Sequence, residues 1–209
     1  MVINYNNKHI KLGENMILFK RFQLNRLRKK VGILCQERLS NEVPDAAVQK
    51  EIVLYKKIGR IYDAMYRSKK FPYVREMAIE SYRLAADLGD VHSIRTVGER
   101  LLEFGKFWES MEGTLYYNDV HAVYKRQYFD EAFLYLNTAN DLDDVISKRL
   151  LGLSYINAWG VEADVDRGLT YVIESLDLED AWPRSSAIFA ELGLDKPEFF
   201  KKIMSLKRG

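Results

Sequence analysis

An internal repeat constrains the fold of this chain more than any other feature of its sequence. When the sequence is shifted by 54 residues, residues 78–98 align with residues 132–152, and 9 of the 21 aligned positions are identical. The identical pairs are Ala78/Ala132, Ala85/Ala139, Asp87/Asp141, Leu88/Leu142, Asp90/Asp144, Val91/Val145, Ser93/Ser147, Arg95/Arg149 and Gly98/Gly152. Self-similarity at a fixed spacing indicates a repeat architecture, in which each unit buries its apolar face against its neighbours.

The repeated unit predicts two helices joined by a tight corner. Helical spacing of apolar and small residues places the first helix at about 74–88. Gly89 suits the left-handed position that follows a helix end, and Asp90 and Asp144 suit the N-caps of the second helices. Residues of the second helices expected to face inward are Ile94, Val97, Gly98, Leu101 and Leu102, with Leu150, Leu151, Gly152, Tyr155 and Ile156 in the other copy.

Two partial copies extend the repeat region in both directions. The run Ile58-Gly59-Arg60-Ile61-Tyr62 is similar to the runs that begin at Val97 and Leu151, which predicts a helix over about 45–68. A shift of 36 residues pairs Tyr135 with Tyr171 and Asp144 with Asp180, which predicts a third, degenerate unit at about 165–193. The repeats therefore span residues 45–193, between an N-terminal segment (1–44) and a C-terminal helix (194–209).

One junction resembles a known repeat family. The pattern Leu151-Gly152-x-x-Tyr155-x-x-Ala158-Trp159-Gly160-Val161-x-x-Asp164-x-x-Arg167-Gly168-x-x-Tyr171 resembles the Sel1-like repeat, a relative of the tetratricopeptide repeat (TPR). The sequence departs from that family's pattern at Ala158, Gly168 and Leu176. The resemblance implies an all-α, right-handed solenoid of helix pairs with a concave surface. It also implies a non-catalytic adaptor or scaffold for a protein or peptide partner, with a bacterial secretion or envelope complex as a setting.

The 54-residue spacing exceeds the 36-residue unit by 54 − 36 = 18 residues, which fall near 106–127. Insertions in repeat arrays map to loops on one face, often the binding face. This aromatic-rich insert has two interpretations of equal weight: a recognition surface, or an elongated helix or hairpin that covers the core. The candidate partner-binding residues are Phe107, Trp108, Tyr116, Tyr117, Tyr124 and, at the junction, Trp159.

The two ends of the chain predict capping elements. Weak alternation over residues 1–12, with Asn6-Asn7 at its centre, is compatible with a small hairpin. Residues 15–39 predict a basic amphipathic helix with Ile17, Leu24, Leu27, Val31 and Leu34 on one stripe, which favours an N-terminal cap. Residues 195–207 predict a C-terminal helix whose Phe199, Phe200, Ile203 and Leu206 cover the last repeat.

The charge distribution leaves a second function open. The net charge is only +2, but residues 1–40 carry 9 − 2 = +7 and residues 141–181 carry 3 − 10 = −7. A nucleic-acid or anionic-membrane binder acting through the N-terminal 40 residues is therefore the alternative function, although the near-neutral total disfavours nucleic acid. The candidate basic patch is Arg21, Arg26, Arg28, Lys29 and Lys30.

Nothing in the sequence predicts an enzyme, a cofactor or a metal site. His9, His92 and His121 lack metal-ligand spacing, the lone Cys35 is expected to be a buried structural thiol, and phosphate-loop, dinucleotide and nucleophile-elbow motifs are absent. No apolar run reaches the roughly 18–20 residues of a membrane span, and no signal-peptide pattern is present. The sequence therefore favours a cytoplasmic protein.

Overall fold

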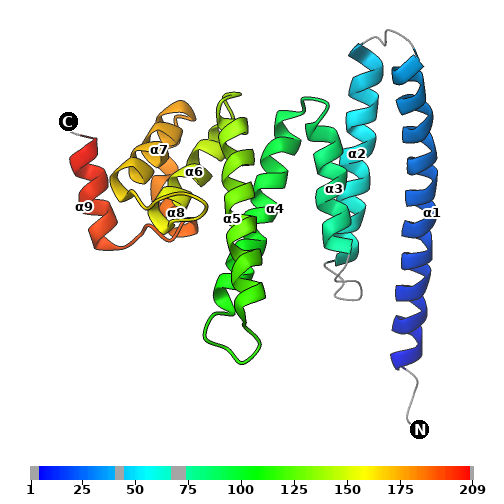
Figure 1. The fold of residues 1–209 in the computed structure, drawn as a ribbon, viewed down its shortest axis with the longest axis horizontal. Helices are drawn as coiled ribbons and strands as arrows, with labels where there is room; N and C mark the ends of the chain where they lie inside the picture. Colours follow the sequence, from blue (N-terminus) through cyan, green and yellow to red (C-terminus); the bar gives the residue numbers. More distant parts are fainter. Residues whose placement is uncertain (1–4, 41–44, 67–73, 208–209) are drawn as a thin grey trace. The chain divides into compact units, whose positions relative to one another are not determined.

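A computed structural model describes residues 5–40, 45–66 and 74–207, and all regular structure in these ranges is helical (Figure 1). The prediction of an all-α fold is confirmed. The elements are α1 (Tyr5–Ser40), α2 (Asp45–Tyr66), α3 (Val74–Ala86), α4 (Val91–Ser110), α5 (Asp119–Asn140), α6 (Val145–Asn157), α7 (Val165–Leu178), the 3-10 turn η1 (Trp182–Arg184), α8 (Ser185–Glu191) and α9 (Pro197–Leu206). None of the described helices is long and apolar enough to cross a bilayer.

Capping aspartates begin the helices where the repeat predicts them. The Asp90 carboxylate accepts a hydrogen bond from the Ser93 backbone N–H at 2.9 Å, and the Asp144 carboxylate accepts one from Ser147 at 2.8 Å. Gly89 has the left-handed φ of 86° expected after α3, whereas Asp143 takes the equivalent conformation after α5. These local signals end one helix and start the next within four residues.

The chain divides into two compact units, residues 1–93 and 94–209. In the first unit α2 packs against both α1 and α3. The α2–α3 contact is close at Gly59, where an added Cβ would meet the Tyr82 ring at 2.7 Å. A salt bridge between Lys56 and Asp90 then joins α2 to the corner that follows α3, at 2.9 Å. The apolar core of this unit is therefore fastened at its edge by an ion pair.

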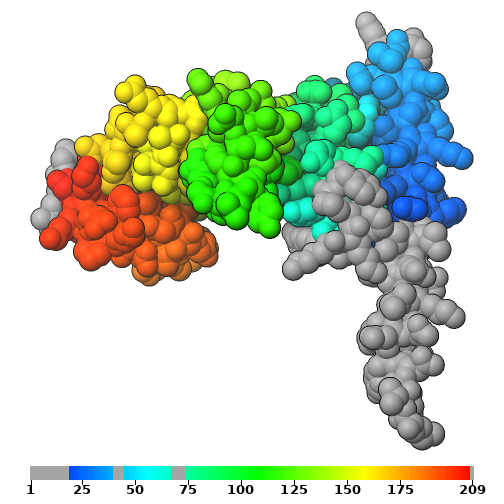
Figure 2. Space-filling model, turned by 60° about the horizontal axis from the view of Figure 1, so that its bottom comes forward, coloured from blue at the N-terminus to red at the C-terminus, as the bar shows by residue number. Residues whose placement is uncertain are grey.

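The second unit contains α4 from Ile94 onward and all later helices. Helices α5 and α6, α6 and α7, and α7 and α9 pack in pairs. In space-filling form the surface of this unit passes in chain order from the green α4–α5 hairpin to the red α9 (Figure 2). Gly98, which the repeat places on the inward face, allows a close approach: a Cβ there would lie 2.8 Å from Leu136 of α5.

The apolar stripe on α1 is buried where α1 packs against α2, as expected of a helix that caps the first unit. Leu24, Leu27 and Val31 are buried and Leu34 is half-buried, whereas Ile17 lies outside the side chains that the structure describes. Cys35 is also only half-buried, with its Sγ 3.9 Å from Arg38 Nη2, so the expectation of a buried thiol is wrong.

Two further expectations about the ends of the chain are corrected. The hairpin is wrong over residues 5–12, because α1 begins at Tyr5 and these residues are helical; residues 1–4 lie outside the described residues. In α9 Ile203 is buried as expected, but Phe200 and Leu206 are exposed. Helix α9 packs against α7, and Phe200 and Leu206, three residues before and after Ile203, lie to either side of the buried position.

Candidate recognition surfaces

The inserted residues extend two helices and form the tip of the α4–α5 hairpin. Helix α4 has 20 residues against 13 in its repeat counterpart α6, and α5 has 22 against 13 in α3. These extensions account for most of the 18 extra residues, so the insert is an elongated helix pair joined by residues 111–118. We use the name tip for residues 107–124, at the lower end of the hairpin in Figure 1.

An aromatic stack fixes the geometry of the tip. The Trp108 ring from α4 stacks on the His121 ring from α5 with centroids 4.3 Å apart, and Phe107 meets Trp108 edge to face at 5.1 Å. The Asn118 side chain accepts hydrogen bonds from the backbone N–H groups of Val120 and His121, while His121 Nδ1 accepts one from the Asn118 N–H. His121 therefore caps a helix and supports a ring stack.

A carboxylate crosses from the loop to α5. Glu112 accepts a hydrogen bond from the Tyr117 hydroxyl at 3.1 Å and also binds the Lys125 ammonium. These hydrogen bonds from Lys125 and Tyr117 hold the pKa of Glu112 below its usual value. The ionised Glu112 thus holds the loop against α5 at neutral pH. A loop that is already held in place loses less conformational entropy when a partner binds.

Outside this framework the tip exposes large apolar side chains. Leu115 is fully exposed and Tyr116 is 78% exposed, and both lie in the loop. The other exposed members are Phe107, Val120, Val123 and Tyr124. Val120 and Tyr124 are four residues apart on α5 and so share one face. Exposed apolar side chains gathered on a rigid support are typical of a protein-interaction surface.

The predicted partner-binding residues divide into exposed and structural ones. Phe107, Tyr116 and Tyr124 are exposed, whereas Trp108 and Tyr117 are half-buried in the tip framework. Trp159 is only 9% exposed: its ring stacks on Phe129 at 5.7 Å, and its Nε1 donates to Glu109 at 3.2 Å. The structure therefore places Trp159 in the core of the second unit.

Trp159 also lies beneath a lysine. The Lys106 ammonium sits 4.1 Å from the centroid of the Trp159 ring, and burial lowers the pKa of that lysine. Sequence reasoning missed Leu115, Val120 and Val123 as members of the exposed surface. Apolar residues such as these fit a buried helix face as well as an exposed surface. Only the length of the α4–α5 hairpin shows that they are exposed.

The predicted basic patch follows α1. Arg21, Arg26, Arg28, Lys29 and Lys30 are exposed. Arg28 is engaged within the first unit, because its guanidinium donates a hydrogen bond to the Tyr62 hydroxyl and lies 5.7 Å from the ring centroid. Binding of nucleic acid or an anionic membrane by this patch stays a prediction.

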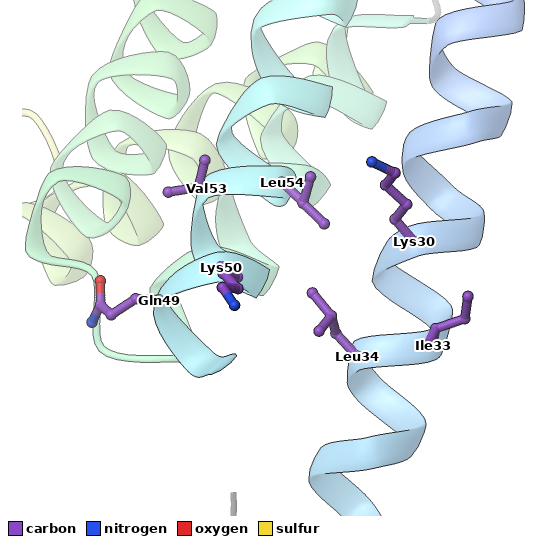
Figure 3. A pocket seen from close by; sticks show the side chains of 7 residues that line it. All are labelled: Lys30, Ile33, Leu34, Gln49, Lys50, Val53 and Leu54. Atoms are coloured by element: carbon purple, nitrogen blue, oxygen red, sulfur yellow. The ribbon is translucent and has the colours of Figure 1, made fainter. Parts of the chain in front are cut away.

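An apolar groove lies between α1 and α2 in the first unit (Figure 3). Its volume is about 550 Å³, and its lining residues are Lys30, Ile33, Leu34, Gln49, Lys50, Val53 and Leu54. Leu34 and Leu54 are half-buried at its floor, whereas Ile33 and Val53 are 56% and 59% exposed. No local sequence pattern predicts this groove, because its two sides come from different helices.

Side chains suited to metal chemistry do not gather in the part of the chain that the structure describes. No three His, Cys, Asp or Glu side chains there are arranged to hold a metal ion. His92 is exposed at the start of α4, His121 belongs to the tip framework, and the side chain of His9 lies outside the described ones. The sequence matches no known protein family, and no curated protein is significantly similar to it.

Proposed function

We propose that this chain is a non-catalytic adaptor, a short right-handed solenoid of the Sel1/TPR type that binds a protein partner through its tip. The observation that carries the proposal is the set of exposed apolar side chains at the tip, above all Leu115 and Tyr116. Fully exposed side chains of this size are costly in water, and their burial at roughly 25 cal/mol per Å² favours association.

The tip has the composition of an interaction hot spot. Tyrosine and tryptophan are enriched where most binding energy resides, and Tyr116 and Tyr124 present their rings to solvent. The stack of Trp108 on His121 and the cap at Asn118 hold the backbone beneath these rings. A preorganised surface loses less conformational entropy on binding than a mobile one. The Sel1 resemblance supports the same class of function, with a bacterial secretion or envelope complex as its setting.

The test is affinity capture from cells in which the protein naturally occurs, followed by mass spectrometry. The variant Leu115→Ser/Tyr116→Ser/Tyr124→Ser changes three exposed side chains and leaves the Trp108–His121 stack in place. The matched control is Leu178→Ser/Phe200→Ser, which removes exposed apolar side chains of α7 and α9.

We expect the wild type and the control to retain a common protein that the tip variant loses by about tenfold or more. Thermal unfolding followed by circular dichroism must show the same Tm for all three chains. If the wild type retains no protein, or if the tip variant retains the same partner at the same level, the proposal is wrong.

A further inference from the structure

The α1–α2 groove is a second apolar surface, and it belongs to the first unit. The two helices run antiparallel: Lys20 of α1 donates to the Ala64 carbonyl of α2 at 3.3 Å, and Arg38 binds Glu51 at 3.0 Å, so the numbering rises on one helix as it falls on the other. Between these contacts Leu34 and Leu54 form an apolar floor, and Ile33 and Val53 stand exposed on either side. Figure 3 shows Leu34 and Leu54 directed toward each other across the groove.

The charged side chains that line the groove are all positive. Lys30 and Lys50 line it, and the lining contains no Asp or Glu. Outside the lining, Lys57 lies seven residues after Lys50 on α2 and Arg26 one turn before Lys30 on α1, whereas Glu37, one turn after Ile33, is an acidic neighbour. None of these four cations has a hydrogen-bond or ion-pair partner within the described part of the chain. The nearby carboxylate of Glu51 is 1% exposed and already paired with Arg38.

We propose that this groove binds an acidic amphipathic helix from a protein partner. Apolar side chains on one face of that helix fill the space above Leu34 and Leu54, and carboxylates beside the face pair with Lys30 and Lys50. The tip and the groove then give the chain two recognition surfaces of different chemistry. Such a pair is what an adaptor that joins two proteins requires.

The shape of the groove favours a helix over a lipid. Side-chain ridges of one helix fit the grooves of others at interaxial distances of roughly 8–10 Å, and a helix anchors itself through residues at i, i+3, i+4 and i+7. A bilayer surface instead needs apolar side chains that project past the flanking charges. Here Leu34 and Leu54 are recessed at the floor of the groove. A side chain of a bound helix reaches them more readily than a flat bilayer surface does.

The experiment is a selection from a displayed library of helical peptides about 18 residues long, which span about 27 Å. Each peptide carries a fixed apolar stripe at i, i+3, i+4 and i+7, and its other positions are randomised. The library is selected on the full wild-type chain and counter-selected on Ile33→Asp/Val53→Asp. Both substituted positions are exposed, so the variant keeps the core intact, which circular dichroism verifies.

Enriched peptides are then titrated by fluorescence anisotropy. We expect them to carry a net negative charge and to bind Lys30→Glu/Lys50→Glu at least about tenfold more weakly than wild type. The control Lys201→Glu, an exposed charge reversal on α9, leaves the affinity unchanged. Raising NaCl from about 0.05 M to about 0.5 M weakens binding to wild type more than binding to the charge-reversed variant.

Three outcomes overturn the proposal. The first is that no peptide is enriched in a manner that depends on Ile33 and Val53. The second is that the enriched peptides are neutral or basic. The third is binding of vesicles of phosphatidylcholine and phosphatidylserine, lost in Ile33→Asp/Val53→Asp, while no acidic peptide binds; the groove then faces a membrane. None of these results depends on Tyr116 or Tyr124, so the tip proposal stands or fails separately.

Discussion

Arg38 and Glu51 illustrate how single residues hold α1 against α2. Glu51 is almost completely buried, and the Arg38 guanidinium pairs with it at 3.0 Å from the adjacent helix. Burial, and then the charge of Glu51, raise the pKa of the neighbouring Tyr55 to about 12. An ion pair in this position contributes less by its own attraction than by the cost of leaving one partner alone.

We therefore expect Arg38→Ala to destabilise the first unit by about 3 kcal/mol, because it leaves a buried carboxylate without its cation. All three tryptophans, at positions 108, 159 and 182, lie in the second unit, so hydrogen exchange of α2 peptides is the suitable measurement. The expected change is exchange roughly a hundredfold faster. Replacing both partners, as Arg38→Met/Glu51→Leu, should restore most of the protection. Unchanged exchange in Arg38→Ala would contradict the argument.

Asp90 makes the first unit sensitive to acid. Burial alone would raise the pKa of Asp90, but hydrogen bonds from Ser93 and Lys56, with the charge of Lys56, outweigh it and lower the pKa. A carboxyl group whose pKa is lower in the folded state stabilises the fold above its unfolded pKa. That contribution disappears as the pH falls through the folded value.

We expect Asp90→Asn to lower the Tm at about pH 7 and to reduce the further loss of Tm between about pH 5 and about pH 2. Asparagine still caps a helix, so the comparison isolates the charge. Thermal unfolding across that pH range, followed by circular dichroism, gives the result. If both proteins lose the same number of degrees, the titration of Asp90 does not contribute.

At the scale of elements, helix pairs approach through glycine. Gly168 of α7 faces Gly152 of α6, and a Cβ added at Gly168 would lie 2.5 Å from the Gly152 carbonyl oxygen. A backbone atom cannot move aside as a flexible side chain can, so the two helices would have to separate. The repeat predicts that Gly152 faces inward, and the contact with Gly168 gives the reason that a glycine stands there.

Gly168→Ala should destabilise the second unit by about 2 kcal/mol, because the added methyl group has no space. Urea unfolding followed by tryptophan fluorescence measures this directly. Gly32, on α1, is the matched control, since no atom lies within 4 Å of a Cβ built there. Gly32→Ala should instead stabilise its helix by up to about 1 kcal/mol. This stabilisation is measured as slower hydrogen exchange in α1. Equal destabilisation by both substitutions would show that helix contact is not the cause.

Local signals made the repeat helices predictable, and their absence explains the errors. The helix expected at about 74–88 ends at Ala86, because Gly89 and Asp90 specify the corner themselves. The repeat spacing reveals the 18 extra residues but not the structure that they adopt, because aromatic residues suit both long helices and loops. Tyr116 is exposed and Trp159 is buried because of the helices that pack, or do not pack, beside them. The sequence near each residue does not specify those neighbours.

At the scale of the whole molecule, the near-zero net charge is the sum of a basic segment, residues 1–40, and an acidic stretch, residues 141–181. In the acidic stretch 141–181, four carboxylates form ion pairs within the second unit: Asp144 with Arg95 at 2.9 Å, Asp166 with Lys202 at 2.7 Å, Glu174 with Lys148 at 2.8 Å and Glu179 with Arg149 at 2.6 Å. By contrast, Lys29 and Lys30 of α1 lack an ion-pair partner among the described residues. Lys29 and Lys30 are therefore available to an acidic partner.

Site-specific photo-crosslinking in living cells tests whether the tip contacts a protein partner. A photoreactive phenylalanine analogue replaces Tyr116 in one strain, and Phe200 of α9, which is also exposed, in a control strain. We expect illumination to join the Tyr116 position to one discrete protein, identified by mass spectrometry, and the Phe200 position to yield no such product. No crosslinked protein at Tyr116, or the same products at both positions, would contradict it.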